Sequence, residues 1–179
     1  MSYDKLPYVV INRWVLDDLE EQSLMSRTIS YQGREYSSLM PGREIPEVVN
    51  ATDAAFRQKP FITYSVDNDE MQTNGYKTKE SITYVIWGPS VEVVSGIAYC
   101  IKDLTSREDW SIFDLNQFIN SDALTTKKFH FMQMCFEQIS GPKPIKQESG
   151  RHAMIVSISY DYAPNGEWAP FTKGQGRWS

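Results

Sequence analysis

Four segments of the chain carry the apolar patterns of β-strands. Residues 61–66 (FITYSV) and 82–87 (ITYVIW) are rich in β-branched and aromatic residues; the first follows a proline and the second ends at a Gly-Pro pair. Residues 127–139 are apolar on both faces for half their length, which predicts a central strand covered on both sides. Residues 151–162 alternate between apolar and polar positions, which predicts a half-buried strand.

Two helices are expected between the second and third strands. Ser90 is a fair N-cap for the first helix, and Glu92 lies in its first turn, where a negative charge is favoured. A shorter second helix is expected to follow. The side chains expected to form the apolar stripe of the first helix are Val91, Val94, Ile97, Ala98, Ile101 and Leu104. The second helix is expected to run through Phe113, Leu115, Phe118 and Ile119.

The first 58 residues show weaker patterns. Residues 8–24 fit a helix with Val10, Trp14 and Leu24 inward and acidic residues outward. Residues 27–59 contain scattered glycines and prolines, which indicate irregular chain or short elements. Between the first two strands, the Asn74-Gly75 pair suits a turn.

Together these elements predict an α+β fold: a mostly antiparallel four-stranded sheet, in the chain order β-β-α-α-β-β, with helices packed on it. Residues 1–162 are expected to form one domain, in which residues 1–58 are the less regular part. Residues 163–179 (APNGEWAPFTKGQGRWS) hold three glycines, two prolines and three large aromatic residues. We expect this segment to form a C-terminal aromatic, glycine-rich arm.

Composition narrows the class of protein. Of the 179 residues, 41% are hydrophobic and 23% charged, which is typical of a folded globular chain. The net charge is −5, and no dense Lys/Arg cluster occurs, so specific nucleic-acid binding is disfavoured. No apolar run approaches the roughly 20 residues needed to cross a bilayer. The first residues lack the pattern of a secretion signal, so we expect a cytoplasmic protein with no membrane association.

Residues suited to catalysis are few. The chain has two histidines, His130 and His152, and two cysteines, Cys100 and Cys135. His130, His152 and Cys135 could form a metal or nucleophile site if their strands pair, or the histidines could simply be packed in the core. On a regular strand, however, His130 and Cys135 project to opposite faces. We expect two buried thiols, and the alternative is a disulfide between Cys100 and Cys135. No catalytic residue, bound metal or cofactor is expected.

Charged and aromatic residues outside the core are candidates for contacts between subunits. Arg107, Glu108, Asp109 and Asp114 could form an acid/base pair, an ion-pair network between subunits, or simply acidic residues at helix starts. Residues 140–149 (SGPKPIKQES) form either a docking loop or an ordinary solvent loop. The predicted interface residues are Arg107, Glu108, Asp109, Asp114, Lys143, Lys146, Arg151, Trp168, Phe171 and Trp178.

Seven short phrases, in this order and spacing on a β-β-α-β-β frame, give the chain a family resemblance. They are Ile45-Pro-Glu47, Lys59-Pro-Phe-Ile-Thr-Tyr64, Glu80-Ser-Ile-Thr-Tyr-Val-Ile86, Asp103-Leu-Thr-Ser-Arg-Glu-Asp109, Asp114-Leu-Asn116, Phe129-His-Phe-Met132 and Glu148-Ser-Gly-Arg-His-Ala-Met154. The pattern covers roughly residues 45 to 162 and resembles tail terminator, or tail completion, proteins of long-tailed bacteriophages, especially contractile-tailed ones. None of these phrases is a catalytic signature.

This resemblance implies a small α+β subunit that closes into a homohexameric ring on the last ring of the tail tube. Such a ring stops tube growth, presents the tail to neck and head-completion proteins, and lets DNA pass through it. The implied partners are other copies of the chain, the tail tube protein, neck proteins and possibly a sheath-end protein. The implied location is the virion, after assembly in the host cytoplasm. A sheath-capping or head-completion ring, a small-ligand or metal-binding domain, and a monomeric adaptor are the alternatives.

Overall fold

The computed structural model describes residues 6–44, 58–67, 77–121, 129–144 and 151–164. The predicted turn at Asn74-Gly75 lies outside these residues. The elements in chain order are α1 (Pro7–Glu21), β1 (Thr28–Tyr31), β2 (Arg34–Ser37), β3 (Leu39–Pro41), the 3₁₀ helix η2 (Gly42–Glu44), β4 (Phe61–Asp67), β5 (Thr78–Gly88), α3 (Val91–Thr105), α4 (Asp109–Ser121), β6 (Phe129–Pro144) and β7 (His152–Pro164).

Within the part of the chain that the structure describes, the main sheet has five strands in the order β3-β4-β5-β7-β6. Every neighbouring pair is antiparallel except β3 and β4, which are parallel. Strands β1 and β2 form a separate antiparallel hairpin. The α+β class and the mostly antiparallel sheet are therefore as predicted, but the four-stranded sheet is wrong. The extra strand, β3, is only three residues long, too short to leave an apolar pattern of its own.

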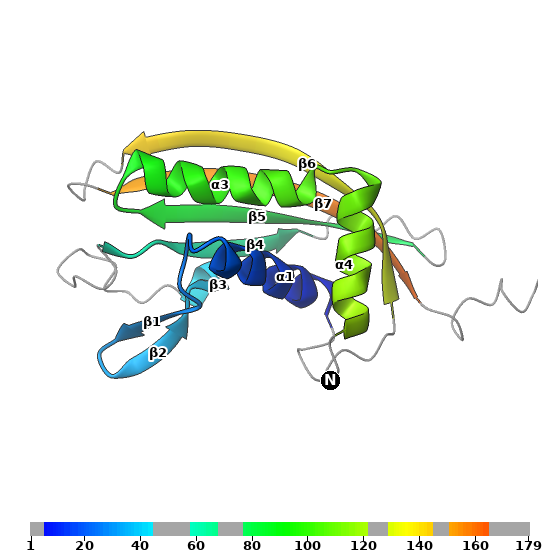
Figure 1. The fold of residues 1–179 in the computed structure, drawn as a ribbon, viewed down its shortest axis with the longest axis horizontal. Coiled ribbons are helices and arrows are strands. Elements are labelled where there is room, and N and C mark those ends of the chain that lie inside the picture. The colour runs from blue at the N-terminus through cyan, green and yellow to red at the C-terminus, as the bar shows by residue number, and fades with distance from the viewer. Residues whose placement is uncertain (1–5, 45–57, 68–76, 122–128, 145–150, 165–179) are drawn as a thin grey trace, which may run out of the picture.

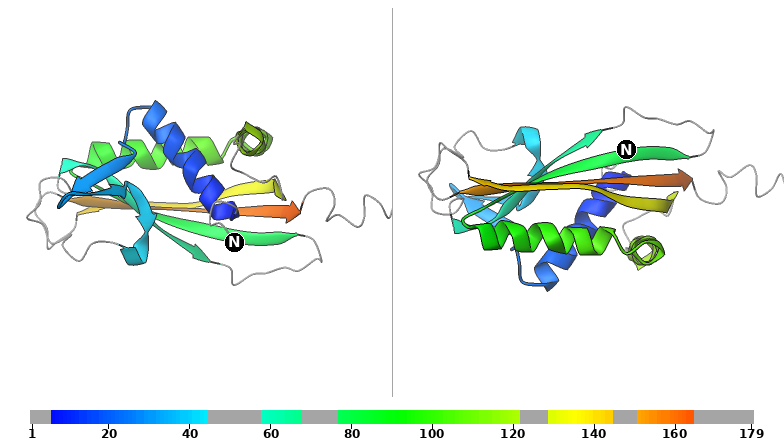
Figure 2. Two further views of the ribbon diagram at one scale, coloured as in Figure 1. Left: turned by 90° about the horizontal axis from the view of Figure 1, so that it is seen from below. Right: turned by 90° about the horizontal axis from the view of Figure 1, so that it is seen from above.

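Helices α1, α3 and α4 lie on one face of the main sheet, with α3 running along it and α4 crossing near its end (Figures 1 and 2). Helix α3 contacts β5, β6 and β7, and α1 contacts both α3 and α4. The Ser90 side chain caps α3 by accepting a hydrogen bond from the Val93 amide, 3.3 Å away. The predicted stripe of α3 is buried at every position except Val91, which is 41% exposed.

Among the described residues, those that pack on the opposite face of the sheet gather at one end. Phe61 of β4 and Trp87 of β5 lie side by side, with stacked rings 6.0 Å apart. Residues of the β1–β2 hairpin and β3 pack on them in a second apolar cluster that includes Ile29, Tyr31 and Met40. Beyond this cluster the face carries mainly polar side chains. We call this polar part the open face.

The predicted central strand at residues 127–139 is in fact the edge strand β6. Its pairing with β7 shifts register between Phe131 and Gln133, which inserts one extra residue opposite the partner strand. Phe131 and Met134 are consequently both buried on the helix-covered face, whereas Met132 is 45% exposed. Apolar residues that the pattern assigned to two different faces of the strand therefore lie on one face, because the bulge reverses the alternation of the side chains.

Helix α1 packs its apolar side against the rest of the core, as predicted for residues 8–24. Val10 and Trp14 are buried, and Leu24, which follows the helix, is partly buried. The hydroxyl of Tyr84, at the centre of β5, donates a hydrogen bond to Asn12 Oδ1 at 2.8 Å. Complete burial raises the pKa of Tyr84 above its usual range, so this phenol stays a donor. Within the described residues, no helix combines the length and apolarity that crossing a bilayer requires.

Candidate functional site

Three of the predicted interface residues gather at the turn between α3 and α4. Arg107, Glu108 and Asp109 are all exposed there. Glu108 adopts a positive φ of 53°, which reverses the chain between the two helices. The buried hydroxyl of Ser111 holds the turn, because it accepts a hydrogen bond from the Arg107 amide at 3.0 Å and donates one to the Leu104 carbonyl at 2.7 Å. The turn is thus firmly fixed while its charged side chains project outward.

Directly after this turn, α4 exposes two large aromatic rings. Trp110 and Phe113 are each 58% exposed, and their rings meet edge to face at 5.8 Å. The buried stripe of α4 is formed by Ser111, Leu115 and Ile119 at four-residue intervals, which places Phe113 on the outer side of the helix.

The fourth predicted charge, Asp114, has a structural contact. Its carboxylate accepts a hydrogen bond from the indole nitrogen of Trp14 at 2.9 Å, joining α4 to α1. A groove of about 400 Å³ lies between the two helices at this point. The groove is lined by four carboxylates and by aromatic and amide side chains: Trp14, Asp17, Asp18, Glu21, Asp114, Gln117 and Phe118. We call it the α1–α4 groove.

The remaining predicted interface residues are spread over the fold. Lys143 lies on β6, exposed and paired with Ala153 of β7, because the strands continue into the segment expected to be a loop. Arg151 is buried, with 3% of its surface exposed. Lys146, Trp168, Phe171 and Trp178 lie outside the described residues.

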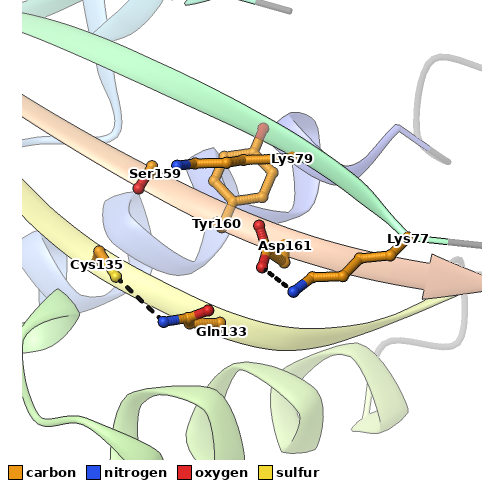
Figure 3. A pocket seen from close by; sticks show the side chains of 7 residues that line it. All are labelled: Lys77, Lys79, Gln133, Cys135, Ser159, Tyr160 and Asp161. Atoms are coloured by element: carbon orange, nitrogen blue, oxygen red, sulfur yellow. Dashed lines mark hydrogen bonds and ion pairs between the residues drawn. The ribbon is translucent and has the colours of Figure 1, made fainter. Parts of the chain in front are cut away.

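The open face holds a shallow hollow of about 240 Å³ (Figure 3). Its lining comes from the end of β5 and from the adjoining parts of β6 and β7, and Lys77 forms an ion pair with Asp161 across it at 2.6 Å. A second hollow, of about 420 Å³, shares Lys79 and Ser159 with the first. Because hydroxyls and both signs of charge line these hollows, they suit contact with a polar surface better than an apolar ligand.

The predicted neighbours His130, His152 and Cys135 do not come together. Strands β6 and β7 pair as required, but His130 lies opposite Ala163 while Cys135 lies opposite Ser159, and His152 is at the other end of β7. Eleven residues of β7 separate the two histidine positions, roughly 36 Å along the strand. The bulge also places His130 and Cys135 on the same face, contrary to expectation. Among the described residues, no group of histidine, cysteine or carboxylate side chains is arranged to hold a metal ion.

Both cysteines are half-buried free thiols, so the disulfide that the sequence left open does not form in this structure. The Cys100 thiol donates to Asp18 Oδ2 at 3.0 Å. Burial, with a further contribution from this hydrogen bond, raises the pKa of Cys100 to about 12. The protonated thiol is therefore a donor that helps to hold Asp18, and it is a poor nucleophile.

Sequence reasoning missed Trp110 as a surface residue. Its position gives a usable signal: it directly follows three charged residues and lies on the opposite side of α4 from Leu115.

In comparisons with known proteins, no family model and no curated protein matches this sequence.

Proposed function

We propose that this chain is a structural virion protein, a tail terminator that forms a ring on the end of a bacteriophage tail tube. In this role the ring stops tube growth and provides the surface that joins the tail to the neck. The proposal names no catalytic residue, metal or cofactor. Its partners are other copies of the chain, the tube protein and neck proteins, while DNA passes through the ring.

The observation that carries the proposal is the order of the sequence phrases on a strand framework. One phrase runs into β4, one lies within β5, one opens β6 and one runs into β7; these are residues 59–64, 80–86, 129–132 and 148–154. The family resemblance implies an α+β subunit with helices packed on a mostly antiparallel sheet, and this chain has that architecture (Figure 2).

The surface supports the proposal in a second way. A closed ring needs heterologous contacts, in which one patch of each subunit meets a different patch of the next. This subunit presents exposed aromatic rings on α4 and a polar open face on the opposite side of the sheet. Aromatic residues are enriched in the cores of protein interfaces, and Trp110 and Phe113 supply such a core.

Electron microscopy of the purified full-length protein, alone and mixed with tail tubes, tests the proposal. We expect closed six-fold rings, either free or seated on one end of each tube, and tubes that no longer elongate. A particle that remains monomeric both free and on tubes would instead support an adaptor. Binding to purified sheath or portal complexes, but not to tubes, would move the assignment to a sheath-capping or head-completion ring.

A further inference from the structure

Trp110 and Phe113 lie at one end of a continuous surface along α4. Gln117 is exposed one turn beyond Phe113, and it lines the α1–α4 groove together with Asp114 and Phe118. The surface therefore begins with two exposed rings and ends in a groove rich in carboxylates. Its composition suits a segment that carries both aromatic side chains and cations.

The carboxylates of the groove are held in position by other residues. Asp17 pairs with Arg27, Asp18 accepts from Cys100, and Asp114 accepts from Trp14. A carboxylate has about four lone-pair sites, so each of these groups retains capacity to accept further hydrogen bonds. Among the described residues that line the groove none is a cation, although Arg27 outside it pairs with Asp17. The other three carboxylates therefore favour a positively charged occupant.

The chain itself contains a segment of matching chemistry beyond Pro164. Residues 165–179 (NGEWAPFTKGQGRWS) include three large aromatic side chains, two cations and a single carboxylate side chain. The aromatic residues Trp168 and Phe171 precede the cations Lys173 and Arg177. That order matches a surface on which the exposed rings of α4 are followed by the acidic groove.

The reach of this segment is sufficient for a contact between subunits. An extended chain spans about 3.3 Å per residue, so these 15 residues reach roughly 50 Å. A compact chain of this size has a radius of gyration of only about 16 Å. The segment follows Pro164, which is paired with Phe129 at the end of the sheet beside α4. It can therefore extend past its own subunit to the adjacent one.

We infer that residues 165–179 of each subunit dock on the α4 surface of the next copy. In this arrangement Trp168 and Phe171 contact Trp110 and Phe113, and the cations enter the α1–α4 groove. Each subunit contributes one segment and one acceptor surface, which is the heterologous contact that a closed ring requires. This inference rests on the proposed ring for its choice of the neighbouring copy.

Cross-linking in the full-length protein tests the contact. Phe171 is replaced by photoreactive benzoylphenylalanine, chains with and without ¹⁵N are mixed and assembled, and the irradiated product is digested for mass spectrometry. We expect peptides from residues 107–118 joined to the C-terminal segment, with the two isotopes on opposite sides of the link. Links to any other surface, or links confined to a single chain, would overturn the inference.

Two matched pairs of variants sharpen this test. Trp110→Ala combined with Phe113→Ala should lower the cross-linking yield at least tenfold, whereas Tyr99→Ala, which removes another exposed ring on α3, should leave it unchanged. Gln117→Lys should also lower the yield at least tenfold by placing a cation in the groove, whereas Gln117→Glu should not. Equal yields within both pairs would contradict the assigned surface.

Measuring particle mass in parallel separates the two proposals. Hexameric rings in which the segment is linked to another surface would contradict the proposed docking surface but not the terminator function. Links between chains at residues 107–118 in a protein that forms no ring would support the docking surface and contradict the proposed ring. The side chains substituted on α3 and α4 are exposed, so a thermal midpoint within a few degrees of the parent protein is expected to confirm that each variant is folded.

Discussion

The indole nitrogen of Trp14 on α1 lies 2.9 Å from Asp114 Oδ2 on α4, across a separation of 100 residues. Trp14 is only 4% exposed, so its ring contributes to the core while its N–H holds a carboxylate at the helix junction. This contact joins α1 to α4 at the α1–α4 groove, which both residues line.

Trp14→Phe should therefore destabilise the protein more than removal of one hydrogen bond donor from the surface would. The variant retains most of the buried ring but deprives Asp114 of its charge-assisted bond and leaves a small void, for a combined cost of about 2 kcal/mol. Urea unfolding followed by circular dichroism measures the cost. Trp110→Phe is the control and should change the free energy of unfolding by less than about 0.5 kcal/mol. Equal effects of the two substitutions would show that the contact contributes nothing.

Ile97→Asp tests the buried stripe of α3. Ile97 is fully buried against the sheet, and an uncompensated charge there costs on the order of 3–5 kcal/mol, a large part of the stability of a small domain. We expect insoluble or unfolded protein by circular dichroism. Val91→Asp, on the same helix but 41% exposed, should give soluble and folded protein. A natively folded Ile97→Asp variant would mean that this stripe of α3 is not buried in the core.

The contrast between α3 and β6 shows which features of the fold are encoded locally. In α3 the helical repeat is uninterrupted, so its buried residues could be predicted from spacing alone. In β6 the register shifts three times, and each extra residue reverses the side-chain alternation that prediction relies on. Strand β6 lies at the edge because, of the described strands, it pairs only with β7. That pairing is a tertiary relationship, which a single sequence does not display.

The candidate surface was predicted in part for a similar reason. The charges at residues 107–109 are consecutive and follow a helix, so their exposure could be predicted. Asp114 is close to them in sequence, but its partner is Trp14, and no local pattern indicates a contact over such a distance. Phe113 is exposed on α4 although large aromatic residues are usually buried, so its residue type alone does not predict its position.

Asn116→Ala should loosen the edge of the sheet. The Asn116 side chain donates to the Phe131 carbonyl and accepts from the Phe131 amide, both at 2.9 Å, and so joins α4 to β6 beside the bulge. Losing both bonds should cost about 1–2 kcal/mol and speed exchange of the Phe131 amide proton at least tenfold, as measured by hydrogen exchange. Gln117→Ala, one residue along on the exposed side, should leave that exchange rate unchanged. Unaltered protection of the Phe131 amide proton in Asn116→Ala would show that the Asn116 side chain does not hold α4 against β6.

Glu80 supplies a pH-dependent prediction. This carboxyl lies on the helix-covered face of β5, is 8% exposed, and accepts a hydrogen bond from the Tyr160 hydroxyl at 3.3 Å. Burial raises its pKa above the ordinary value, although hydrogen bonds from Tyr160 and Tyr162 oppose the shift. The folded protein consequently binds this proton more tightly than the unfolded chain does.

It follows that ionisation of Glu80 removes stability as the pH rises from the unfolded carboxyl value, about 4.3, through the raised folded value. Glu80→Gln keeps an oxygen acceptor for Tyr160 and has no proton to lose. The free energy of unfolding of the variant, minus that of the parent, should therefore increase from about pH 4 until the pH has passed the raised folded pKa, and then level off. Urea midpoints of the variant and the parent, measured from about pH 4 upward, provide the test. A difference that stays constant or falls with pH would mean that the carboxyl is not desolvated in the folded state, and the packing assigned to this end of the sheet would then be wrong.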